Sequence, residues 1–159
     1  MTGFDALYRE HAPHVFRFAL YLCGDRSEAE DLTSETFVRA WASPEPIRMA
    51  TVKGYLLTIT RNLYLQGQRR TPRHVALPED LREPRAGADV AIELGAELEA
   101  TLSDLQRLPE GERAALLMRA TEDVPYEEIA RALGITLATA KVRIHRARLA
   151  LARLREARR

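Results

Sequence analysis

The sequence has little cysteine, almost no net charge and no apolar run long enough to cross a bilayer. Its single cysteine, Cys23, excludes an intrachain disulfide framework, which agrees with a protein of the reducing cytoplasm. The first residues, MTGFDALYREHAPHVF, lack the cationic and then apolar pattern of a signal peptide. Because a helix needs about 20 apolar residues to span a bilayer, we expect no membrane insertion. The net charge of +1 argues only weakly for any partner.

Residues that would support catalysis or metal binding are also scarce. His11, His14 and Cys23 do not complete a tetrahedral set of metal ligands at a standard spacing. The chain has no nucleophile motif and no glycine-rich phosphate loop. We therefore expect no metal, no cofactor and no enzymatic activity.

Hydrophobic periodicity predicts an all-α protein. Apolar residues recur at helical spacing on both sides of a proline-containing stretch, and no segment carries a strong strand signal. With 46% hydrophobic residues the chain can bury a core, and 159 residues suffice for two small domains. The sequence predicts a helical domain over 1–71, a flexible linker over 72–88 and a second helical domain over 89–159.

Local signals predict several helix boundaries. Ser27 followed by Glu30 forms a capping-box pattern, so a helix is expected to start there. The sequence SPEP at 43–46 should end that helix, because proline lacks the backbone donor. Further along the chain, Pro109 should open another helix.

The stretch from Val124 to Arg155 has the pattern of a helix-turn-helix, whose second helix enters the major groove of DNA. Pro125 suits the first position of the first helix, and Gly134 suits a left-handed turn. Thr136 can then cap the second helix. This motif predicts DNA binding.

The second helix of the motif has an apolar side and a basic side. Apolar positions spaced by four, three, four and three residues predict one buried stripe: Ala140, Ile144, Ala147, Leu151 and Leu154. The residues expected away from this stripe, near base edges and phosphates, are Thr139, Lys141, Val142, His145, Arg146 and Arg148. A plain helical hairpin with a basic surface is the alternative.

Both halves of the chain resemble the extracytoplasmic-function (group 4) sigma factors of bacterial RNA polymerase, in the sigma-70 family. The stretch LPEGERAALLMRATEDVPYEEIARALGITLATAKVRIHRAR resembles the sigma-4 domain. The stretches SEAEDLTSETFVRAW and GYLLTITRNLYLQGQRR resemble parts of the sigma-2 domain. The resemblance implies a factor that binds core RNA polymerase, directs promoter-specific initiation and is controlled by an anti-sigma factor.

The resemblance also implies which residues contact the polymerase, at its beta-prime clamp helices and its beta flap. The helix expected to dock on the clamp helices carries Asp31, Leu32, Glu35 and Phe37. Alternatively, the apolar members of this helix are core, which we favour for Phe37 and Trp41. Asp31 and Glu35 lie four residues apart on one face of the helix, and we expect this acidic pair to contact the polymerase.

Promoter contacts follow from the same resemblance. The minus-35 element would be contacted by the helix with Lys141, Arg143, His145 and Arg146. The minus-10 element would be contacted by the segment with Thr60, Arg61, Asn62, Gln66, Arg69 and Arg70. The loop over 42–53 would capture a flipped base, but it has no aromatic residue and does not reveal which residues would do so.

The chain departs from the family pattern at a few of these positions. Ser34 stands where the family often has glutamine, Tyr55 where it usually has tryptophan, Gln66 where it usually has aspartate and Val142 where serine is common. These departures leave the promoter sequence unpredictable. Two other functions remain: a sigma-like decoy that binds an anti-sigma factor without DNA, and a repressor or activator that uses only the C-terminal half.

Overall fold

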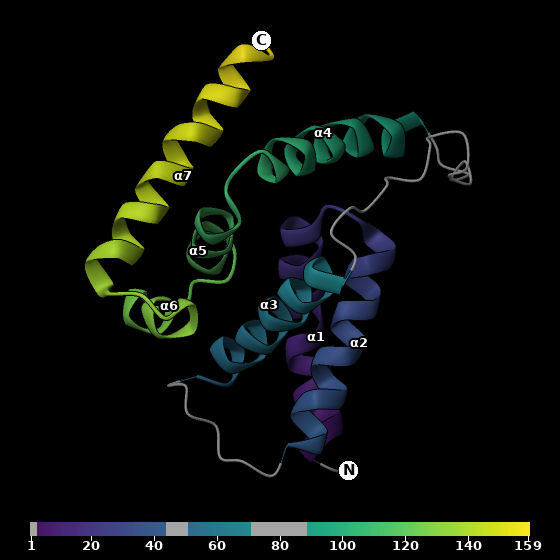
Figure 1. Ribbon diagram of the computed structural model, residues 1–159. Helices are drawn as coiled ribbons and strands as arrows, with labels where there is room; N and C mark the ends of the chain where they lie inside the picture. The colour runs from purple at the N-terminus through teal and green to yellow at the C-terminus, as the bar shows by residue number, and fades with distance from the viewer. Residues whose placement is uncertain (1–2, 44–50, 71–88) are drawn as a thin grey trace.

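The computed structural model describes residues 3–43, 51–70 and 89–159. Within these ranges every regular element is an α-helix (Figure 1), which confirms the predicted all-α class. The helices are α1 (Gly3–Cys23), α2 (Arg26–Ala42), α3 (Val52–Arg70), α4 (Asp89–Gln106), α5 (Glu110–Ala120), α6 (Tyr126–Leu133) and α7 (Leu137–Ala157). None of these helices is long and apolar enough to cross a membrane.

The turn between α1 and α2 is built by Gly24 and Asp25. Gly24 has a φ of 77°, a left-handed conformation that glycine adopts without a steric cost. The carboxylate of Asp25 accepts hydrogen bonds from the backbone N–H of Ser27 at 2.8 Å and of Glu28 at 3.4 Å. Asp25 is therefore the cap of α2, and the capping box predicted at Ser27 is wrong by two residues. A carboxylate is a stronger acceptor for these amides than a hydroxyl.

The helices α1, α2 and α3 pack on one another and bury a shared apolar interior. Phe18 and Leu22 of α1 and Leu56 and Leu57 of α3 have no exposed surface. Full burial of such a side chain contributes about 1.5–3 kcal/mol, so these four residues are a main source of stability for the N-terminal half.

The helices α5, α6 and α7 form the C-terminal half together with α4, which packs on α5 and α7. Pro109 and Pro125 are the caps of α5 and α6, each one position before the first helical residue. Their φ angles of −53° and −59° fit the ring constraint, and an extended ψ ends the preceding loop. Both helices thus begin one residue later than predicted.

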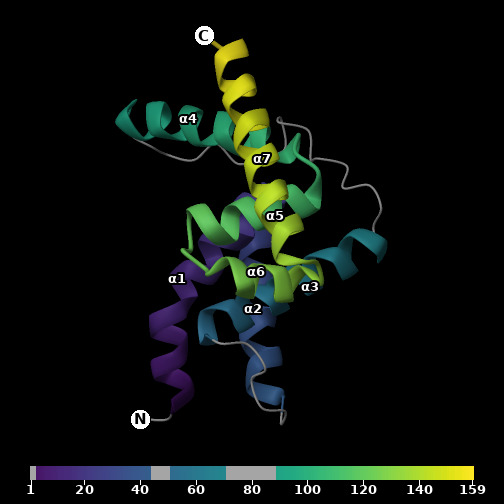
Figure 2. The same cartoon turned by 90° about the vertical axis from the view of Figure 1, so that its left-hand side faces the viewer.

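The two halves pack against each other. In Figure 1, α5 and α6 lie between α7 and the N-terminal helices, and Figure 2 views the molecule from the side on which α7 lies. α1 contacts α4 and α5, α3 contacts α5 and α6, and the buried side chains form one continuous cluster. The sequence left this arrangement open. The predicted linker over 72–88 lies entirely outside the described residues, so the domain boundaries stay a prediction.

Candidate nucleic-acid interface

The turn of the helix-turn-helix is formed by the residues that the sequence predicted for it. Gly134 ends α6 with φ 68° and ψ 37°, in the left-handed region that favours glycine. The backbone N–H of Ile135 donates to the carbonyl of Ala130 at 2.9 Å and closes the turn. The hydroxyl of Thr136 then accepts from the backbone N–H of Thr139 at 3.1 Å and caps α7.

The recognition helix α7 buries one stripe and exposes another. Ala140, Ile144 and Ala147 are buried against α5 and α6, which confirms the first three positions of the predicted stripe, while Leu151 and Leu154 are half-buried. Five predicted contact residues are exposed: Lys141, Val142, His145, Arg146 and Arg148. Thr139 is half-buried and bonded to Thr136. The front of α7 is therefore a basic surface that a DNA groove can reach.

Arg143 does not lie on this front. Its side chain is half-buried against the start of α5, where a methyl group added at Gly111 would lie 2.6 Å from its Nη1 atom. Arg143 is adjacent in sequence to the buried Ile144, and its side chain packs against the first turn of α5. The expectation that Arg143 contacts the minus-35 element is not supported by this placement.

Tyr126 is a residue of this interface that sequence reasoning missed. The guanidinium of Arg119 lies 4.7 Å from the centre of its ring, and Nζ of Lys141 lies 5.7 Å from it. The contact with Tyr126 holds the ammonium end of Lys141 over the ring, near the start of α7. Tyr126 directly follows Pro125 at the start of the motif, but its sequence spacing from Lys141 gave no sign of the contact.

The residues of α3 predicted to contact the minus-10 element differ in how exposed they are. Asn62, Gln66 and Arg69 are exposed. Arg61 is only 13% exposed, because its Nε and Nη2 atoms each donate to a carboxylate oxygen of Glu110 at 2.7 Å. The side chain of Arg70 lies outside the described residues.

Thr60 is not part of the DNA face. It is fully buried, and its hydroxyl donates to the carbonyl of Leu56 at 2.9 Å. The same hydroxyl lies 2.9 Å from that of Thr36 on α2. The role expected for Thr60 in meeting the minus-10 element is wrong, because this hydroxyl joins α3 to α2 in the interior.

The face of α2 predicted for the polymerase is acidic at one end and apolar at the other. Asp31 and Glu35 are exposed, as a partner face requires. Leu32 and Phe37 are buried, and Phe37 packs edge-on against the ring of Tyr8 at 4.8 Å. The predicted polymerase contact by these two apolar residues is not supported, because their side chains face the interior.

Trp41 is not part of the core, so the expectation favoured for it is wrong. Its side chain is 64% exposed, and its ring packs edge-on against that of Phe4 at 4.7 Å. Trp41 lies in the last turn of α2, and Phe4 belongs to the first turn of α1. Residues 44–50, which make up most of the predicted base-capture loop, lie outside the described residues.

Two family models match the chain. "Sigma-70 region 2" matches residues 7–74, and "Sigma-70, region 4" matches residues 99–151. The first covers most of α1 and all of α2 and α3, and the second covers the C-terminal part of α4, all of α5 and α6, and most of α7. Within the described residues no cluster of three or more potential ligands could hold a metal ion.

Curated relatives and solved structures agree with these models. The chain is 41% identical to the "ECF RNA polymerase sigma factor SigE" of Mycolicibacterium smegmatis over 93% of its length, but spans only 60% of that protein. It is 32% identical to SigL of Mycobacterium tuberculosis, covering 92% of this chain and 85% of SigL. The sigma factor RpoE of Bartonella quintana, solved with the anti-sigma factor NepR, matches with a TM-score of 0.78 and 26% identity over the full length of both chains.

These matches span both halves of the chain in the predicted order. Sigma factors are transcription initiation factors, so the expectation that the chain is not an enzyme is confirmed. The chain belongs to the extracytoplasmic-function sigma factors of the sigma-70 family.

Proposed function

We propose that this protein binds core RNA polymerase in the bacterial cytoplasm and directs it to a small set of promoters. The exposed basic front of α7 carries this proposal. Lys141, His145 and Arg146 project from a helix whose turn, cap and buried stripe hold it rigidly on α5 and α6. Side chains on such a helix can contact base edges of the minus-35 element, while the flanking arginines contact phosphates.

The minus-10 element is assigned to α3. Its exposed polar residues Asn62, Gln66 and Arg69 lie on one helix, and Arg61 can join them when Glu110 is displaced. Cations that hold phosphates beside polar groups that meet unpaired bases suit a strand that is being separated. Binding energy at this face would favour the opened promoter over the closed duplex.

The polymerase contact is assigned to the exposed acidic pair of α2. Asp31 and Glu35 lie four residues apart, so their carboxylates share one face of the helix. A basic surface on the clamp helices of the beta-prime subunit would be the complementary partner. The C-terminal half would engage the beta flap, as the resemblance to sigma-4 implies.

An anti-sigma factor is the proposed regulator. The RpoE structure that this fold matches contains the anti-sigma factor NepR, and the CnrH structure, with a TM-score of 0.71, contains the cytosolic domain of CnrY. Both neighbours match over nearly all of this chain. We therefore place this protein among factors that a protein partner holds until a signal releases them.

Run-off transcription tests the proposed function. The purified protein is added to core RNA polymerase on fragmented genomic DNA, and the new transcript starts are sequenced. We expect discrete starts that share two upstream elements. The protein with Lys141→Ala and Arg146→Ala together is the matched control, and it should lose those starts.

Two other outcomes would contradict the proposal. Polymerase binding without any new start, from a folded protein, would show that promoter recognition is absent. Neither polymerase binding nor new starts, together with capture of an anti-sigma factor, would indicate a decoy.

A further inference from the structure

The outer side of α7 carries an apolar side chain at its middle. Val142 is 46% exposed, whereas Ala140 and Ile144 are buried. Two residues correspond to about 200° around an α-helix, so Val142 lies on the opposite side of α7 from both of these core residues. Among the described helices, α7 contacts only α4, α5 and α6, and it faces the viewer in Figure 2. The methyl groups of Val142 therefore point away from the interior.

A second small apolar residue lies on the same face. Ala138 is exposed and lies four residues before Val142, one turn closer to the start of α7. Residues near the start of a recognition helix are the ones that meet base edges in the major groove. The front of α7 is therefore short and apolar in its first two turns, and it becomes long and polar only at His145 and Arg146.

The long cations of these first turns lie at the flanks of the front. Lys141 and Arg143 are each one residue from Val142, so they lie about 100° to either side of it. Nζ of Lys141 lies 5.7 Å from the centre of the Tyr126 ring, and the guanidinium of Arg143 packs against Gly111. One flank is thus held by α6 and the other by α5, and neither cation covers Val142.

A short front of this kind suits close approach to the bases. The major groove is about 12 Å wide and about 8.5 Å deep, which is comparable to the diameter of a helix of about 10–12 Å. Small side chains at the front let the helix enter further than a lysine or an arginine would. On the edges that the four bases present in the major groove, the apolar group is the C5-methyl of thymine. Because Val142 has no side-chain donor or acceptor, this methyl group is the base feature that it matches.

Valine also suits a fixed contact. Its two γ-carbons leave one strongly preferred rotamer in a helix, so the methyl groups of Val142 are in place before DNA binds. Covering them with the methyl group of a base removes apolar surface from water at little cost in side-chain entropy. Serine, which is common at this position in the family, would instead offer a hydroxyl to the groove.

We propose that Val142 is a specificity-determining residue that contacts the C5-methyl group of one thymine in the minus-35 element. The inference rests on the proposed function, because it assigns this element to α7. The element should then contain an A·T pair at the position that faces Val142. Arg146 lies four residues further, about 6 Å along the helix, so we expect this thymine about two base pairs from the pair that Arg146 contacts.

Exchange of thymine for uracil isolates the contact, because uracil pairs in the same way and lacks only the methyl group. The protein is combined with core RNA polymerase and bound to a promoter fragment found by run-off transcription. Each thymine of the minus-35 element, on both strands, is replaced in turn, and the affinity is measured by competition with the unmodified fragment. One exchange should weaken binding of the wild type about fourfold, the equivalent of about one buried CH₂ group.

Variants of α7 connect that thymine to Val142. Val142→Ser removes both methyl groups, so its binding should not respond to the exchange. Val142→Thr keeps one methyl group and nearly the same shape, and it should retain part of the response. The matched control is Leu149→Ser, because Leu149 is equally exposed at 46% but lies seven residues further along α7. This control should respond about fourfold, as the wild type does.

The proposal is supported if one thymine shows a methyl effect that Val142→Ser abolishes and Leu149→Ser preserves. It is overturned if the element contains no A·T pair, if no exchange weakens binding of the wild type, or if Val142→Ser responds as strongly as the wild type. Failure of the proposed function is distinguishable, since run-off transcription would then give no discrete starts with the wild type or with any variant. The assignment of Val142 would fall with it.

Discussion

Arg113 on α5 donates a hydrogen bond to the hydroxyl of Tyr64 on α3 at 3.1 Å, inside the interior that the two halves share. Both side chains are buried, and burial raises the pKa of Tyr64. The other terminal nitrogen of Arg113 donates to the carbonyl of Leu108 at 3.0 Å. The buried charge of Arg113 thus depends on neutral oxygens from two different parts of the chain.

Tyr64→Phe should lower the free energy of unfolding by about 1–3 kcal/mol, because it leaves a buried guanidinium N–H without its acceptor. Urea denaturation followed by circular dichroism measures this loss. Tyr8→Phe is the matched control, since the Tyr8 ring is 46% exposed and water can replace any partner of its hydroxyl. Equal stability of the two variants would contradict a structural role for the Arg113–Tyr64 bond.

Cys23 should make the folded protein less stable at alkaline pH. Burial raises the pKa of its thiol to about 12, whereas the unfolded chain should titrate at about 8.5. The unfolded state therefore loses a proton first, and the free energy of unfolding falls as pH rises through this window, by at most about 1.4 kcal/mol per pH unit.

Urea midpoints of the wild type and of Cys23→Ser, compared between about pH 7.5 and about pH 10.5, measure that dependence. The serine variant should lose less stability than the wild type over this range. Slow alkylation of the folded wild type at about pH 8 is a second readout, because the thiolate is the reactive form. Identical pH profiles would show that Cys23 does not titrate as its burial implies.

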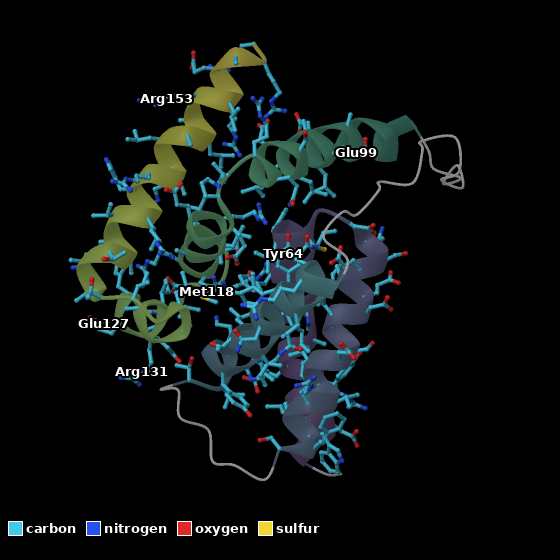
Figure 3. The ribbon with its side chains drawn as sticks, in the orientation of Figure 1. Tyr64, Glu99, Met118, Glu127, Arg131 and Arg153 are labelled. Atoms are coloured by element: carbon cyan, nitrogen blue, oxygen red, sulfur yellow. The ribbon has the colours of Figure 1, made fainter. Side chains whose placement is uncertain are left out.

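Lys141→Ala and Arg146→Ala should each weaken binding to a promoter fragment. A base contact is worth about 1–3 kcal/mol, while loss of a phosphate contact lowers the slope of log affinity against log salt by about one. Fluorescence anisotropy at several salt concentrations separates the two cases. Arg153→Ala, on an exposed part of α7 far from its N-terminus, is the control (Figure 3). Wild-type affinity in both variants would rule out α7 as the recognition helix.

Asp31→Ala combined with Glu35→Ala should weaken binding to core RNA polymerase. Both carboxylates are exposed, so we expect a slower association rate that depends strongly on salt. Surface plasmon resonance with immobilised polymerase measures it. Glu30→Ala removes an exposed charge on the same helix but from a neighbouring face, and should have a smaller effect. The assignment fails if the double variant associates at the wild-type rate.

The helix-turn-helix could be predicted from the sequence because its signals are local. Gly134, Thr136 and the stripe of Ala140, Ile144 and Ala147 act within a few residues of one another, and the structure places all of them as expected. The cap of α2 is also local, but Asp25 and Ser27 are both residue types that cap helices, and the spacing to Glu30 favoured Ser27 over Asp25.

The misplaced site residues depend on contacts between distant parts of the chain. Arg61 is held by Glu110, 49 residues away, and no periodicity within α3 could reveal this partner. Thr60 is a polar residue of the segment predicted to meet the minus-10 element, yet its hydroxyl lies 2.9 Å from that of Thr36, 24 residues away on α2. Trp41 is exposed although it lies four residues after the buried Phe37, so helical spacing alone did not separate the two.

The covalent connection between the two halves sets how strong their interface has to be. A short tether gives one half an effective concentration around the other of about 1 mM. An interface with an intrinsic dissociation constant of only about 0.1 mM would then remain closed in about nine molecules of ten. With an interface of that strength, a protein cut between residues 70 and 89 would separate into its halves at micromolar concentration. A partner that binds only the separated halves would then have to supply only the small free energy of separating them. Most intact molecules would still have their halves packed together.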